Sequence, residues 1–130
     1  MALTTTYANA IANYLRGAGA PVAITAIYLD LYNGDPSNGG TSVLATITGS
    51  ATRDDITGSM AAASGGAAAN DTEVTVTDGA SAAALITYIA LYDAATAGNL
   101  IQANELVEPV GVNLNDTVTF ATGNIVIRVT

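Results

Sequence analysis

Two segments of the chain nearly repeat one another. Tyr28-Leu29-Asp30-Leu31-Tyr32-Asn33 and Tyr88-Ile89-Ala90-Leu91-Tyr92-Asp93 share an alternating pattern, and a glycine-containing turn follows each. Because side chains alternate between the two faces of a strand, leucine and isoleucine point one way in both segments and the tyrosines point the other way. Both faces are therefore apolar, which is typical of a strand covered on both sides. We predict that the two segments are the paired central strands of one sheet.

Composition limits the chemistry available to the chain. It has no histidine, cysteine, lysine or tryptophan, so carboxylates are the only common acid–base groups left for catalysis at neutral pH. The carboxylates considered for a two-carboxylate hydrolase site are Asp54, Asp55, Glu105, Glu108 and Asp116. Nothing in their spacing brings two of them to the separation that such a site needs. We expect no catalytic residue, no cofactor and no enzyme activity.

The formal net charge of −8 restricts the partners that the chain can bind. Arg16, Arg53 and Arg128 are the only basic residues, too few to neutralise a nucleic-acid backbone. No apolar run approaches the length of a membrane span, and the start of the chain lacks the basic and apolar regions of a secretion signal. We therefore expect no nucleic-acid partner and no membrane association.

The order of local patterns predicts a mainly β fold with one N-terminal helix. Residues 4–16 carry an apolar stripe at helical spacing, with glycines just after it. Beyond Pro21 the chain has short β-rich runs separated by turns, and we expect strands near 23–32, 42–48, 72–77, 85–93, 99–107, 116–121 and 124–129. Thr122-Gly123-Asn124 is expected to close the last two strands into a hairpin. The prediction is a single domain, 1–130, in which an antiparallel β-sandwich of about seven strands spans 22–130 and a low-complexity loop spans 49–71.

The tyrosines have two interpretations. Aromatic rings can stack on sugars or bases, which would make the repeated strands a ligand platform and the chain a carbohydrate-binding module. Alternatively, the N-terminal helix covers them, and this single contact explains all six tyrosines. We favour the second interpretation, a helix–sheet contact made by Tyr7, Ile11, Tyr14, Tyr28, Tyr32, Tyr88 and Tyr92.

Oxygen-bearing side chains gather near the first repeated strand. Asp30, Asn33, Asp35 and Asn38 contain the ligand type that calcium prefers, but their spacing does not match an EF-hand loop. Aspartate and asparagine are also favoured in turns, where they bond to nearby backbone groups. We interpret the cluster as a turn and predict no metal site. Asn70-Asp71-Thr72 and Asn115-Asp116-Thr117 fit the glycosylation pattern but are interpreted as turns that lead into strands.

If the tyrosines are covered, the surface that binds partners lies elsewhere. The glycine-rich turn 33–40 and the alanine- and glycine-rich stretch 58–69 are the alternatives that the sequence offers, together with strand edges. The candidate partner-surface residues are Asp35, Pro36, Asn38, Met60, Gly65 and Gly66.

Most of the chain resembles a family of small bacteriophage virion proteins described as tail-fibre-like or as head decoration proteins. The matching pieces are the helix from Tyr7 to Leu15, the strand and turn from Ile27 to Pro36, the segment from Ile86 to Ile101, and the segment from Val112 to Ile127. The order and spacing of these pieces carry the resemblance. It implies a structural component of the virion, assembled in the host cytoplasm and without catalytic residues.

Within that resemblance, we favour a capsid decoration or cement protein that binds the outer surface of the head lattice. Its partners would be the major capsid protein or other virion proteins, with a homo-oligomer as a further alternative. The alternative is a tail or tail-fibre component that contacts the host. Neither a coiled-coil heptad nor an extended repeat is present, which favours the head.

Overall fold

The computed structural model of the chain describes residues 3–21, 23–76 and 80–128. Its longest elements are the helix α1 (Thr5–Leu15) and the strands β1 (Tyr28–Asn33), β6 (Ala84–Tyr92) and β7 (Leu100–Val112). The shorter elements are β2 (Thr41–Ser42), α2 (Leu44–Thr48), β3 (Asp54–Asp55), η1 (Thr57–Ser59), β4 (Ala67–Ala69), β5 (Val74–Thr75), β8 (Thr119–Phe120) and β9 (Val126–Arg128).

The two repeated segments lie side by side in the largest sheet. Its strand order is β2-β1-β6-β7, and β3 also pairs with β1. The pairing of β1 with β6 is antiparallel, and it sets Tyr28 opposite Tyr92 and Tyr32 opposite Tyr88. The prediction that the repeats are paired central strands is therefore confirmed, as is the mainly β, antiparallel fold with an N-terminal helix.

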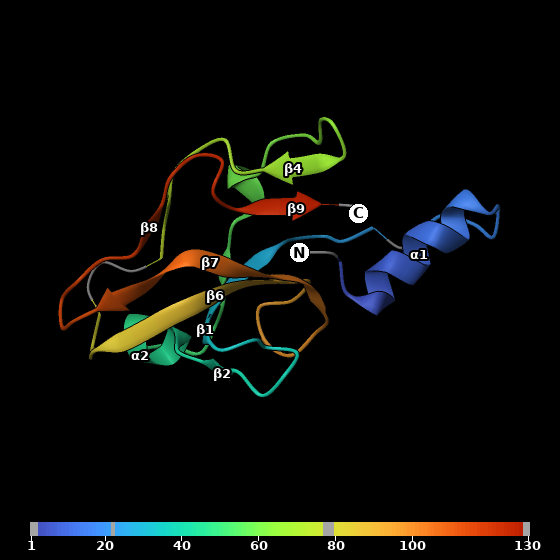
Figure 1. Cartoon of the computed structure of the whole chain (residues 1–130). Helices are drawn as coiled ribbons and strands as arrows, with labels where there is room; N and C mark the ends of the chain where they lie inside the picture. The colour runs from blue at the N-terminus through green and yellow to red at the C-terminus, as the bar shows by residue number, and fades with distance from the viewer. Residues whose placement is uncertain (1–2, 22, 77–79, 129–130) are drawn as a thin grey trace.

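Two short ribbons lie opposite this sheet (Figure 1). One pairs β4 with β9 and the other pairs β5 with β8, both antiparallel. Side chains from the ribbons, from α2 and from the inner face of the sheet form one buried cluster, whose largest members include Leu29, Leu31, Leu44, Ile47, Ile89, Leu91, Phe120 and Ile125. The core therefore sits between two layers, as in a sandwich with an incomplete second sheet.

Three local expectations were wrong. The stretch 42–48 holds the helix α2 instead of a strand, because Leu44 and Ile47 lie three residues apart on one helical face and both are fully buried. The expected terminal hairpin does not form, since β8 pairs with β5 and β9 pairs with β4. The stretch 49–71 is only partly a loop, because β3, η1 and β4 lie within it.

Helix α1 agrees closely with the expected range of 4–16. It ends in a Schellman motif: the Gly17 amide donates to the Tyr14 carbonyl, and the Ala18 amide donates to the Asn13 carbonyl. Gly17 has a φ of 87°, a conformation that this motif requires and that glycine adopts without strain. At the start of the helix, the Thr4 side chain makes no capping hydrogen bond. Its hydroxyl donates instead to the Leu100 carbonyl of β7.

The expected position of α1 on the tyrosine face was wrong. None of its residues, all of which are described, is buried, and Tyr14 and Leu15 are 54% and 77% exposed. Its first turn is bound where β6 ends and β7 begins, and there the Tyr7 hydroxyl donates to Asp93 Oδ2 at 2.5 Å. From that attachment the helix extends away from the sheet (Figure 1), so Tyr14 does not reach the central strands.

The hydrogen bond from Tyr7 is expected to stabilise the fold in a pH-dependent way. It lowers the pKa of Asp93, while burial and Asp93 raise the pKa of Tyr7 to about 12. Because the folded state favours ionised Asp93 and neutral Tyr7, the stabilisation is lost as pH falls through the lowered pKa of Asp93 and as pH rises from about 10 toward 12.

We therefore expect Tyr7→Phe to reduce the free energy of unfolding by about 1 kcal/mol at pH 7. The difference from wild type should shrink below about pH 4. Urea unfolding across this pH range measures it, and Tyr14→Phe, which removes an exposed hydroxyl from the same helix, is the matched control. A difference that stays constant from neutral to acidic pH would contradict the assigned bond.

Candidate functional site

The tyrosine face of the main sheet contains a buried ion pair. Asp30, in the middle of β1, is 3% exposed, and its Oδ2 accepts a hydrogen bond from Arg53 Nε at 3.1 Å. Its Oδ1 accepts from the Leu31 amide at 2.7 Å and from the Ser42 hydroxyl at 2.8 Å. The carboxylate is thus enclosed by donors from three segments of the chain, which compensates the loss of water around it.

Arg53 connects this carboxylate to the loop after β6. Its guanidinium donates to the carbonyls of Ala94 and Ala97 and lies 3.6 Å from the centroid of the Tyr92 ring. Burial raises the pKa of Tyr92, as does its hydrogen bond with Tyr32, whose hydroxyl lies 2.9 Å away. This arginine therefore covers Tyr92, one of the tyrosines that we expected the helix to cover.

The remaining tyrosines of this face are partly accessible. Tyr28, Tyr32 and Tyr88 are half-buried, whereas Tyr92 is 9% exposed. The ligand-platform alternative consequently keeps some physical basis, since three rings retain surface for stacking. A glycan screen comparing Tyr28→Ala and Tyr88→Ala with wild type remains its test, and absent or unchanged binding would exclude it.

The two aspartates among the oxygen-bearing side chains near β1 have different structural roles. Asp30 pairs with Arg53, whereas Asp35 accepts from the Ser37 amide with its side chain and from the amides of Asn38 and Gly40 with its carbonyl. These are bonds of a folded turn, in the sense predicted from the sequence. Among the described residues, no group of three or more acidic side chains is placed to hold a metal ion.

The predicted partner-surface residues lie in two separate places. In the turn after β1, Asn38 is exposed while Asp35 and Pro36 are half-buried. In the alanine- and glycine-rich stretch, Gly65 and Gly66 are exposed in the tight turn before β4. Met60 is half-buried and packs against the core, so it contributes to the fold at least as much as to the surface.

Gly40 is the residue on which the conformation of the turn after β1 depends. A Cβ at this position would lie 2.3 Å from the Gly34 carbonyl oxygen and 2.6 Å from the Asp35 carbonyl oxygen. Both neighbours are backbone atoms that cannot rotate away.

We expect Gly40→Ala to lower the free energy of unfolding by about 2 kcal/mol. Thermal melts measure the change. Gly58→Ala is the control, because nothing lies within 4 Å of the added methyl group, and its free energy of unfolding should change by less than about 0.5 kcal/mol. An unchanged melting temperature for Gly40→Ala would show that the turn is wrongly placed.

The edge strand β7 carries a wide bulge that the sequence did not lead us to expect. Ile86 pairs with Val110 and Tyr88 pairs with Glu105, so two steps along β6 are matched by five along β7. Residues 106–109 therefore leave the regular ladder, and the Val107 side chain is fully exposed. Because proline lacks an amide hydrogen, Pro109 fits such a bulge and not a regular central strand.

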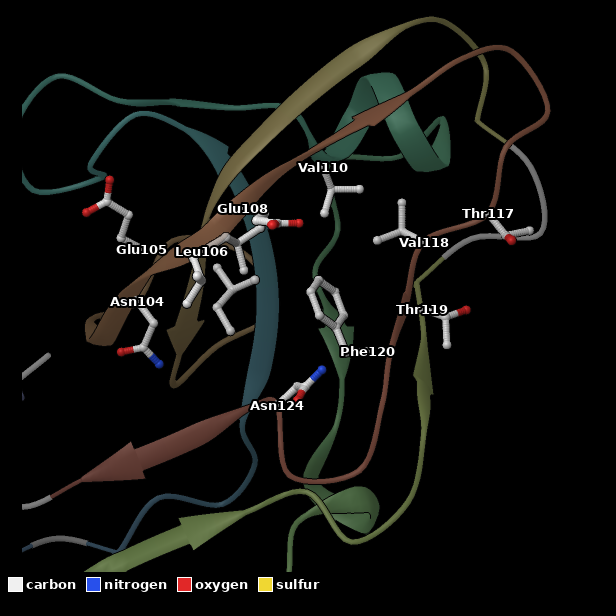
Figure 2. Close-up of a pocket in the computed structure, with 12 residues that line it drawn as sticks. Asn104, Glu105, Leu106, Glu108, Val110, Thr117, Val118, Thr119, Phe120 and Asn124 are labelled. Carbon is white, nitrogen blue, oxygen red and sulfur yellow. The ribbon is translucent and has the colours of Figure 1, made fainter.

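A groove of about 710 Å³ lies between this bulge and segment 117–120. Figure 2 shows Phe120 directed into the space between the two segments, with Val110 and Val118 above it. Leu106 contributes to its wall. The groove floor is therefore apolar, although its upper edge is formed by an exposed part of the chain.

Two carboxylates border the groove but lie differently within it. In Figure 2, Glu108 extends over the groove toward Val110, whereas Glu105 points away from Phe120. Glu105 also lines a neighbouring depression that contains Arg128. Glu108 is thus the carboxylate placed to contact a partner bound in the groove. Its only advance signal in the sequence is the run Leu106-Val107-Glu108-Pro109-Val110, where proline interrupts an apolar strand.

One comparison with known families places the chain. The family model described as "Podophage GP4 fiber I protein gp80" matches residues 2–128, nearly the whole chain. The chain belongs to this family. No curated protein matches it.

Membership of the fibre I family confirms the resemblance to small bacteriophage virion proteins and specifies its tail-fibre-like side. The fibre I family member is accordingly a structural protein of the phage virion, associated there with other virion proteins. Within the part of the chain that the structure describes, no helix is long and apolar enough to cross a bilayer. The family description names a fibre, so it fits the alternative function better than the capsid decoration role that we favoured from the sequence.

Proposed function

We propose that the chain is a component of a tail fibre of a podophage and that it takes part in contact with the host surface. The match to a fibre protein family over residues 2–128 is the observation that carries this proposal. The missing fibre repeat, which had favoured the head, says little about a chain of this size, because a compact domain can form one unit of a longer fibre.

The proposed role depends on binding and not on catalysis. The chain lacks histidine, cysteine and lysine, and Asp30, the most enclosed carboxylate among the described residues, is held by Arg53. Asp30 also accepts hydrogen bonds from the Leu31 amide and the Ser42 hydroxyl, so both of its carboxylate oxygens already have partners within the fold. The half-buried tyrosines and the groove beside β7 are surfaces for contact.

Copy number in purified virions tests the tail assignment. Quantitative mass spectrometry with isotope-labelled peptides should give a copy number that is a small multiple of the tail symmetry, far below that of the major capsid protein. A number comparable with that of the major capsid protein would support the decoration role instead. Tail and head fractions separated after virion disruption provide the internal control.

A further inference from the structure

Helix α1 presents an apolar stripe whose C-terminal end, at Tyr14 and Leu15, stays exposed in the described part of the chain. Tyr14 and Leu15 are 54% and 77% exposed, while Tyr7 and Ile11 on the same stripe are half-buried. An eleven-residue helix is marginal in water without packing on that stripe. The exposed end of α1 therefore has the character of a surface that is completed by a partner.

The helix and the groove beside β7 are complementary in charge. Residues 5–16 contain no acidic side chain and end in the exposed Arg16, whereas Glu108 extends over the groove. Most contacts between copies of a chain with net charge −8 bring negative surfaces together. Contact between α1 and the groove is different, because it sets a cation and apolar side chains against a carboxylate and an apolar floor.

The helix cannot enter the groove of its own chain. Its first turn is fixed to β7 by the Thr4 amide, which donates to the Ile101 carbonyl at 2.9 Å, and to Asp93 by Tyr7. Val107 in the bulge lies six residues beyond Ile101 along the chain, a separation of at most about 20 Å. The helix, about 16 Å long, extends from the opposite end of β7 (Figure 1) and away from the bulge.

We propose that α1 of one copy docks in the β7 groove of a second copy. Tyr14 and Leu15 then pack against Leu106, Val107 and Phe120, and Arg16 lies beside Glu108 of the neighbouring copy. Because helix and groove are different surfaces, the contact is heterologous, and repetition gives a closed ring or a continuing column of copies. The bulge and Pro109 disfavour direct edge-to-edge strand pairing at β7, which leaves the groove as the feature of this edge that a helix can occupy.

Self-association of the purified chain tests the docking. Sedimentation equilibrium should show concentration-dependent oligomers for wild type. Leu15→Ser on the helix and Val107→Ser in the bulge should each lower the association constant by about tenfold or more. Leu114→Ser is the matched control, because Leu114 is also an exposed leucine at 63% but lies outside the groove, and its substitution should have no effect. All three positions are exposed, and thermal melts at low protein concentration check that each variant folds.

Charge reversal separates the proposed contact from unspecific apolar association. Arg16→Glu and Glu108→Arg should each weaken association, and the double variant, in which the two charges exchange places, should restore it. A wild-type chain that stays monomeric up to about 1 mM would overturn the proposal. It would also be overturned if Leu114→Ser weakened association as much as Leu15→Ser, or if the double variant associated no better than the single ones. None of these results depends on whether the chain resides in the tail.

Discussion

Replacing Arg53 with alanine is expected to destabilise the fold by about 3 kcal/mol. The Asp30 carboxylate, 3% exposed, would remain buried in the sheet without its cationic partner. The carbonyls of Ala94 and Ala97 would lose a donor, and the Tyr92 ring would lose the guanidinium that covers it. Urea unfolding followed by circular dichroism measures the change.

A double variant distinguishes a buried ion pair from simple loss of packing. Removing both charges with Asp30→Ala and Arg53→Met should recover most of the stability lost in Arg53→Ala, because no uncompensated charge is left. Arg128→Ala removes an exposed arginine and should change stability by less than about 0.5 kcal/mol. If the double variant lost as much stability as Asp30→Ala and Arg53→Met lose separately and added together, the two residues would not be coupled as the structure shows.

Replacing Asn70 with alanine is expected to cost about 3 kcal/mol through a different mechanism. Asn70 is 2% exposed, its Nδ2 donates to the carbonyls of Thr72 and Ala121, and its Oδ1 accepts from the Ile125 amide. The substitution leaves these three backbone groups without their partner. Ile125 is fully buried, so water does not readily replace the lost bond at its amide.

Asn70→Asp tests which part of the side chain matters. It keeps an oxygen for the Ile125 amide but sets a second oxygen against the carbonyls of Thr72 and Ala121, so it should be at least as destabilising as alanine. Asn9→Ala, on the exposed face of α1, is the control and should stay within about 0.5 kcal/mol of wild type. Wild-type stability for Asn70→Ala would contradict the role of Asn70 as the residue that holds this segment.

Local patterns predicted the parts of the fold that depend on local physics. The alternation in the two repeated segments was sufficient for β1 and β6, and apolar spacing followed by glycine was sufficient for α1. The stretch 42–48 failed because a run of seven residues fits both strand and helix periods when Leu44 and Ile47 are its main apolar anchors.

Long-range contacts decided the rest. Thr122-Gly123-Asn124 does form a turn, but Asn70 binds the backbone on both sides of it, at Ala121 and Ile125. That attachment directs β8 to β5 and β9 to β4, which no hairpin rule describes. The ion pair of Asp30 with Arg53 joins residues far apart in sequence, and the groove arises from a bulge whose one local signal is Pro109.

The location of the chain in the virion tests the proposed function most directly. Electron cryo-microscopy of virions that carry a small folded tag on this chain, compared with untagged virions, gives a difference map of its position. We predict additional density on fibres of the tail, repeated with the symmetry of the tail. Additional density distributed over the head lattice would contradict the account and support the capsid decoration role instead.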